Sequence, residues 1–209
     1  MDASQPIYFT SDSHYYHKNV IKHCGRGPSG SGISDEDKHL WFKDQYEMNE
    51  HLIKAWNDTV PDNAQVFHIG DFSFAAKEKS AEILKRLNGR IHIILGNHDR
   101  KSENFFKEQP NVDWVGPYRE IYIEDSETEH KQPIVLFHYP ILSWNKIHYG
   151  AFHIHVHCHG SVNHMNGNNI LRLDVGVDTR KDYRPYSYHE IKEIMSKRTF
   201  KPIDHHKEY

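Results

Sequence analysis

Five short apolar segments of this 209-residue chain each run directly into Asp, Asn or His. The segments are 7–10, 66–69, 91–95, 134–137 and 151–156, and the polar residues just beyond them include Asp12, His14, Asp71, Asn97, His98, His138, His157 and His159. Apolar runs this short are typical of buried strands. Because ligands of open α/β sheets bind beyond the carboxyl ends of strands, the pattern predicts one polar pocket at a sheet edge.

The spacing of these polar residues favours a metal site. Side chains at i and i+2 of an extended segment share a face, so Asp12 and His14 are expected to point together, as are His157 and His159. Carboxylate and imidazole groups suit divalent ions such as Mn²⁺, Fe²⁺ or Zn²⁺. The whole set exceeds the ligands that one ion takes, which favours two ions sharing a bridging carboxylate.

Each motif alone also has an ordinary structural explanation. Gly70-Asp71 is common turn chemistry, His138 can be a hydrogen-bonded core histidine, and the 157–159 pair lies in a histidine-rich stretch. The chain has 19 histidines, and most are expected at the surface. Gly96-Asn97-His98-Asp99 directly after an apolar run is the most specific signal. The occurrence of all five motifs at strand ends favours a functional site.

Apolar runs that alternate with helical patterns predict an α/β fold. Helices are expected from Ser34 to about Asn57, where Ser34–Asp37 matches a capping box, and over 76–87, 103–108 and 187–197. Further strands are expected at 119–123 and 169–175. The length fits a single domain over residues 1–209. The Gly/Ser-rich stretch 25–32 is interpreted as a mobile loop, either an inert connection or a lid.

Composition narrows the class of protein. The net charge of −3 and the absence of a basic stripe disfavour a nucleic-acid partner without excluding it. Two cysteines form no disulfide framework, and no apolar run approaches the roughly 18 residues of a membrane span. The N-terminal residues do not resemble a signal peptide. We therefore expect a cytoplasmic protein without a membrane partner; the sequence does not indicate its oligomeric state.

The ordered motifs Asp12-x-His14, Gly70-Asp71, Gly96–Asp99, His138 and His157-x-His159 resemble the calcineurin-like metallophosphoesterase superfamily over nearly the whole chain. Further segments are similar to a subgroup of small bacterial and phage enzymes, namely 14–21, 47–49, 56–57, 175–178 and 184–185. The resemblance implies a four-layer α/β/β/α sandwich, with two mixed sheets flanked by helices.

The resemblance also implies a role for each residue. The first metal would be bound by Asp12, His14, Asp71 and His159, and the second by Asp71, Asn97, His138 and His157. Mn²⁺ is the first choice of metal, with Fe²⁺, Ni²⁺ or Zn²⁺ as alternatives. His98 would assist as a catalytic group, with Asp99 orienting it. The family usually has Gly where this chain has Val156, so the bend after the last strand is expected at Gly160.

The implied reaction is hydrolysis of a phosphodiester or phosphomonoester, of a nucleotide-type small molecule, by a hydroxide that bridges the two metals. The residues expected to contact substrate are His17, Asn19 and Arg26. A nuclease with the same chemistry, and a metal-binding regulatory protein without activity, remain as alternatives. The sequence does not name the substrate.

Overall fold

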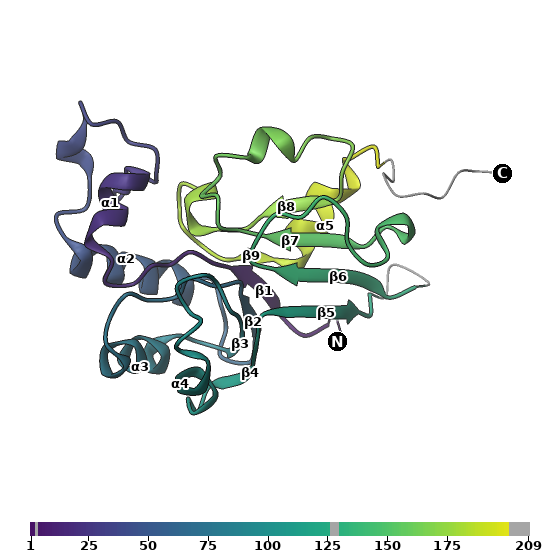
Figure 1. Cartoon of the computed structure of the whole chain (residues 1–209), viewed down its shortest axis with the longest axis horizontal. Coiled ribbons are helices and arrows are strands. Elements are labelled where there is room, and N and C mark those ends of the chain that lie inside the picture. Colours follow the sequence, from purple (N-terminus) through teal and green to yellow (C-terminus); the bar gives the residue numbers. More distant parts are fainter. Residues whose placement is uncertain (3, 126–129, 201–209) are drawn as a thin grey trace.

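The computed structural model describes residues 1–2, 4–125 and 130–200. Within these residues the chain is an α/β protein with two mixed sheets and five α-helices (Figure 1). No helix in the described part is long and apolar enough to cross a membrane.

The first sheet has the strand order β4-β3-β2-β1-β9. Its parallel strands are β1 (Ile7–Thr10), β2 (Gln65–His68), β3 (Arg90–Ile94) and β4 (Val112–Gly116), and β9 (Tyr186–Ser187) pairs antiparallel with β1. Parallel neighbours need crossover connections. Helices supply them: α1 (Lys18–Cys24) and α2 (Gln45–Asn57) precede β2, α3 (Lys77–Arg86) precedes β3, and α4 (Glu103–Lys107) precedes β4.

The second sheet has the order β5-β6-β7-β8. β5 (Tyr118–Ile123) and β6 (Gln132–Phe137) are antiparallel, whereas β7 (Phe152–His155) and β8 (Arg172–Asp174) continue parallel to β6. The last helix, α5 (Tyr188–Ser196), begins at the capping box of Ser187 and Glu190. The short 3-10 helices are η1 (Lys38–Leu40), η2 (Ile147–Tyr149), η3 (Asn163–Met165) and η4 (Val177–Thr179).

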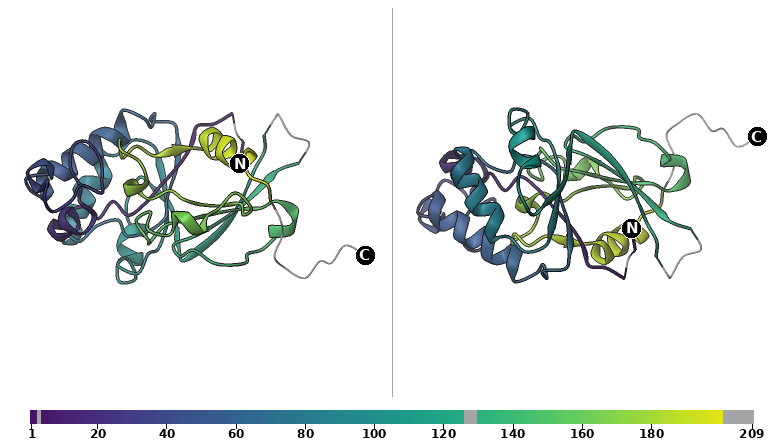
Figure 2. Two further views of the ribbon diagram at one scale, coloured as in Figure 1. Left: turned by 90° about the horizontal axis from the view of Figure 1, so that it is seen from above. Right: turned by 90° about the horizontal axis from the view of Figure 1, so that it is seen from below.

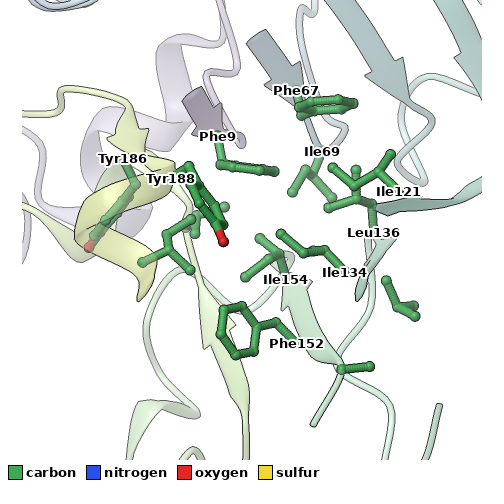
Figure 3. Packing of buried hydrophobic residues seen from close by; sticks show 14 of the residues in the cluster. Phe9, Phe67, Ile69, Ile121, Ile134, Leu136, Phe152, Ile154, Tyr186 and Tyr188 are labelled. Atoms are coloured by element: carbon green, nitrogen blue, oxygen red, sulfur yellow. The ribbon is translucent and has the colours of Figure 1, made fainter. Parts of the chain in front are cut away.

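Two hydrophobic clusters hold the sheets and helices together. Alternating residues of β2 point to opposite faces, so Phe67 joins the cluster between the sheets and Val66 joins the cluster under the helices. Figure 3 shows the first cluster, where Phe9 and Phe67 of one sheet face Ile134 and Ile154 of the other. Burying each of these side chains contributes roughly 1.5–3 kcal/mol. Helices α1–α4 gather on one side of the molecule, and α5 lies beside the N-terminus (Figure 2).

One expectation about the segment before β2 is wrong. The helix expected from Ser34 begins only at Gln45, because Asp44 caps it by accepting from the backbone N–H groups of Tyr46 and Glu47. The Gly/Ser-rich stretch is closely packed rather than a loose connection. A Cβ on Gly27 would lie 2.1 Å from the Leu40 carbonyl oxygen, so this backbone approach needs glycine.

Candidate metal centre

The turns after β1, β2, β3, β6 and β7 bring all seven predicted ligands to one edge of the two sheets. The ligand atoms of Asp12, His14 and His159 lie within 4.8 Å of one another, and we call these residues group one. The same holds for Asp71, His138 and His157, which we call group two. The structure therefore brings these predicted side chains together.

The backbone geometry differs from the expected extended segments. Five of the seven residues have left-handed φ angles: Asp12 at 52°, His14 at 49°, Asp71 at 55°, His157 at 76° and His159 at 47°. The expectation that residues two positions apart share a face of an extended strand therefore does not explain why these side chains meet. Non-glycine residues in this region cost about 1–3 kcal/mol each, and such strain clusters at functional sites. The bend expected at Gly160 already begins at His157, whereas Val156 is buried in extended chain.

Group one contains buried polar atoms that have no hydrogen-bond partner among the described residues. Oδ1 of Asp12 and both ring nitrogens of His14 are in this state. The other oxygen of Asp12 accepts from the backbone N–H of His157 at 3.0 Å. Burial raises the pKa of the Asp12 carboxyl well above its usual range and lowers the pKa of the His14 imidazole. A divalent cation would relieve both effects by pairing with these lone pairs.

Group two contains two acceptors that face each other. Nδ1 of His138 donates to the Ile69 carbonyl oxygen at 2.8 Å, so Nε2 of the neutral ring carries a lone pair. Burial lowers the pKa of His138, which keeps the ring neutral. Its Nε2 nevertheless lies 3.0 Å from Oδ1 of Asn97, which is also an acceptor. A cation held by both atoms accounts for this contact, so the residues fit a metal.

The Asp71 carboxylate lies between the groups. Its Oδ2 is 3.8 Å from Nε2 of His14 and 3.6 Å from Nε2 of His138. Its Oδ1 accepts from the backbone N–H of His98 at 3.0 Å, which leaves Oδ2 directed at both imidazoles. Gly96 permits this arrangement, because a Cβ there would lie 2.2 Å from Oδ1 of Asp71. Asp71 therefore has the position of a bridging ligand.

Asp178 is a buried carboxylate to which the sequence reasoning gave no role. Its Oδ2 accepts from Nδ1 of His159 and from Nη2 of Arg26, both at 2.6 Å. The bond to His159 fixes the ring so that Nε2 is free to face group one. Although burial acts in the opposite direction, Arg26 and His159 hold the pKa of Asp178 below its usual range. In the sequence, Asp178 belongs to the 175–178 segment, which carries part of the family resemblance.

Arg26 was expected to contact substrate, and the structure contradicts this. The side chain is fully buried and makes a two-point contact with Asp178 through Nε and Nη2. It also donates to the carbonyl oxygens of Asp12 at 2.7 Å and Ser13 at 3.0 Å. Arg26 therefore holds the first ligand turn in place. Its position within a glycine-rich stretch hid this role.

The other predicted substrate contacts lie in two different places. His17 lines a cavity of about 550 Å³ next to group one, together with His98. Its ring stacks on Phe74 with a centroid distance of 3.9 Å. Asn19 is an exposed residue of α1 and is not among the residues that line this cavity.

The two predicted catalytic residues also differ in their surroundings. The His98 side chain is exposed, and its ring centroid lies 5.8 Å from that of His14. Asp99 was expected to orient His98, but its carboxylate accepts from the backbone N–H groups of Asp71, Phe72 and Gly96. Burial raises the pKa of Asp99 to about 6. Asp99 thus stabilises the turn that presents Asp71, and its contacts do not support the expected pairing with His98.

Both cysteines line the cavity beside group one. The Sγ of Cys24 lies within 4.8 Å of ligand atoms of His159 and Asp178, which makes a third cluster of metal-binding residue types. In that cluster Asp178 is already paired with Arg26 and His159. Groups one and two therefore remain the two candidate metal-binding groups.

Comparisons with known proteins place the chain among proteins without a described function. No model of a known protein family matches it. The uncharacterized protein MJ1445 of Methanocaldococcus jannaschii is 37% identical over 105 residues, which are 49% of this chain and 52% of that protein. The match thus spans about half the length of that archaeal relative. The gene 66 protein of Mycobacterium phage D29 is 23% identical over 91% of this chain and 96% of its own length.

One solved structure confirms the fold. The protein of unknown function AQ665 from Aquifex aeolicus matches with a TM-score of 0.64 and 24% identity, covering 91% of this chain and 99% of the other. The predicted α/β class with two mixed sheets is therefore correct. At this level of identity the likeness extends to the fold alone.

Proposed function

We propose that this chain is a calcineurin-like metallophosphoesterase, a single-domain enzyme that hydrolyses a phosphoester of a small molecule with two divalent metal ions. The observation that carries the proposal is the position of the Asp71 carboxylate between His14 and His138. Asp12 and His159 complete the first metal position, and Asn97 and His157 the second. The mixture of carboxylate, amide and imidazole ligands suits Mn²⁺ first, with Fe²⁺, Ni²⁺ or Zn²⁺ as alternatives.

Two ions in such a centre polarise phosphoryl oxygens and lower the pKa of water toward neutrality. The protein's own contribution is to orient these ligands. Asp178 holds the His159 ring at Nδ1, and the Ile69 carbonyl does the same for His138. His98 projects into the cavity beside group one, where it can donate a proton to the departing oxygen of the substrate.

The substrate class is a small-molecule phosphoester rather than nucleic acid. The described cavity residues beside group one include no Lys or Arg. Binding to a nucleic-acid backbone requires neutralising several phosphates with such side chains.

A panel of chromogenic phosphomonoesters and phosphodiesters tests the proposal. The purified chain is stripped with a chelator and then reloaded separately with Mn²⁺, Ni²⁺, Fe²⁺ or Zn²⁺. We expect hydrolysis that depends on the added ion and is lost on renewed chelation. A chain that hydrolyses none of the esters with any of these ions would instead be a metal-binding regulatory protein. Steep loss of activity on DNA or RNA with rising salt would point to a nuclease.

A further inference from the structure

Two separate cavities adjoin the candidate metal centre. The first, of about 550 Å³, is lined by His14 and His159 of group one and by His98. The second, of about 420 Å³, is lined by Gly96 and Tyr139, the chain neighbours of Asn97 and His138. The described residues that line one cavity do not line the other. A phosphate bound at the centre would therefore have a separate space beside each ligand group.

Tyr139, which lines the second cavity, also packs against group two. The Tyr139 ring centroid lies 5.1 Å from that of His138 and 4.7 Å from that of His157. Gly96, which also lines the cavity, lies close to the Asp71 carboxylate, since a Cβ on Gly96 would be 2.2 Å from Oδ1 of Asp71. A group attached to a phosphate at the metals is therefore expected to extend toward this cavity.

The walls of the two cavities differ in chemistry. The first carries hydroxyl and imidazole groups, from Ser31, Ser161, His17 and His23. The second is mainly apolar and aromatic, from Leu95, Pro117, Phe137 and Tyr139, with one guanidinium. Flat aromatic groups stack on such side chains and on guanidinium planes. The second cavity is therefore suited to a nucleobase or a similar ring.

That guanidinium belongs to Arg100. It is exposed, and it makes no ion pair or hydrogen bond with any residue that the structure describes. Glu103, the carboxylate of the same cavity, is paired with Nζ of Lys107 at 2.7 Å. Arg100 is therefore available to a ligand, which it can contact by stacking or by donating hydrogen bonds.

We infer that the substrate is a phosphodiester with two organic arms, and that its retained arm places an aromatic ring against Arg100 in the second cavity. This inference rests on the proposed function. The arm in the first cavity leaves, because His98 lines that cavity. A water oxygen bonds to phosphorus while the bond from phosphorus to the leaving oxygen breaks. The leaving oxygen takes a proton from His98, and the water's proton restores His98 through solvent. The products are an alcohol and a phosphomonoester.

Three probes with one leaving group test this inference. They are 4-nitrophenyl phosphate, its methyl diester and its nucleoside 5′-diester, each assayed with the full-length Mn²⁺-loaded chain. The two diesters differ only in the group that the second cavity receives, whereas the monoester lacks such a group and has one more ionisable oxygen. We expect a KM for the nucleoside diester at least tenfold below that for the methyl diester, and a lower kcat/KM for the monoester than for the nucleoside diester.

A pair of variants assigns the effect to Arg100. Arg100→Ala should raise the KM for the nucleoside diester about fivefold or more, since a cation over a ring contributes about 1 kcal/mol, and should raise the KM for the methyl diester by a smaller factor. Lys101→Ala is the matched control, because Lys101 is an exposed neighbouring cation that is not among the residues lining the cavity. An equal effect of Arg100→Ala on both diesters, or a higher kcat/KM for the monoester, would overturn the inference.

A binding measurement distinguishes failure of this inference from failure of the proposed function. If no probe is hydrolysed with any ion, the proposed reaction is wrong, but the cavity can still be tested by calorimetry on the Mn²⁺-loaded chain. A nucleoside 5′-monophosphate should then bind at least tenfold more tightly than inorganic phosphate, and Arg100→Ala should reduce this difference. Equal affinities for the two ligands would contradict the assignment of the second cavity.

Discussion

Oδ2 of Asp71 lies 3.6 Å from Nε2 of His138, although neither atom carries a hydrogen to donate. The proton of the neutral His138 ring is on Nδ1, where it is donated to the Ile69 carbonyl oxygen. Two buried acceptors at this separation repel unless a cation lies between them. This contact, together with the 3.8 Å approach of the same oxygen to Nε2 of His14, is the basis for proposing a centre with two ions.

Substitutions of Asp71 and Asp12 should differ in how many ions they remove. Asp71→Ala takes a ligand from both positions, so we expect less than one bound ion per chain and no activity. Asp12→Ala takes a ligand from group one only and should retain the ion of group two. Elemental analysis after equilibrium dialysis against Mn²⁺ measures both. Two retained ions in Asp71→Ala would show that Asp71 does not bridge.

His98→Ala should separate catalysis from metal binding. The His98 ring is exposed and outside both ligand groups, so the variant should bind metal as the wild type does. Loss of one general acid lowers kcat by about 10²–10⁴-fold. The exposed His39 serves as the control substitution. Loss of metal in His98→Ala, or an unchanged kcat, would reject the assigned role.

Arg26→Ala should chiefly reduce stability. The change leaves the buried Asp178 carboxylate without its guanidinium, and breaking a buried ion pair costs about 3–5 kcal/mol. Arg86→Ala breaks the exposed pair with Glu50 and should cost about 0–1 kcal/mol. Urea denaturation of the apo forms measures both. If Arg26→Ala had wild-type stability and only a raised KM, Arg26 would contact the substrate as the sequence analysis expected.

Stability should fall as pH is lowered from about 6.5 toward 3, partly through His153. Burial, followed by the charge of His155, lowers the pKa of His153 to about 3, so in this range the unfolded chain binds a proton that the folded chain does not. The free energy of unfolding then changes by up to about 1.4 kcal/mol per pH unit for this residue. Denaturation of wild type and His153→Gln at several pH values measures it. A slope that is equal in both proteins would refute the assignment.

Most of the strands and helices could be predicted because their apolar positions are regular, but β4 at Val112–Gly116 was not expected. β1, for example, was expected at its observed residues 7–10. α1 was missed, and it packs through Val20 and Ile21 within a mostly polar segment. β9 was missed because it has two residues and depends on pairing with β1. α2 starts late because Asp44 caps it, and just before this cap the backbone N–H of Phe42 donates to the Arg26 carbonyl oxygen.

The candidate ligands could be predicted from the sequence because Asp, Asn and His are themselves typical metal-binding residues. The residues that support them were not, since Asp178 is separated from Arg26 by 152 positions and meets it only in the fold. The role of Asp99 was misjudged for a similar reason. Its adjacency to His98 suggested a pair, but its carboxylate turns toward the backbone of the β2 turn.

The most direct test of the central claim is a Mn²⁺ titration of the metal-free chain that follows bound metal and phosphodiester hydrolysis together. Two ions per chain should bind, and activity should appear as the second position fills. Electron paramagnetic resonance of the loaded chain should show coupling between ions about 3.5–4 Å apart. Binding of a single uncoupled ion, with activity or without it, would contradict a dinuclear centre bridged by Asp71.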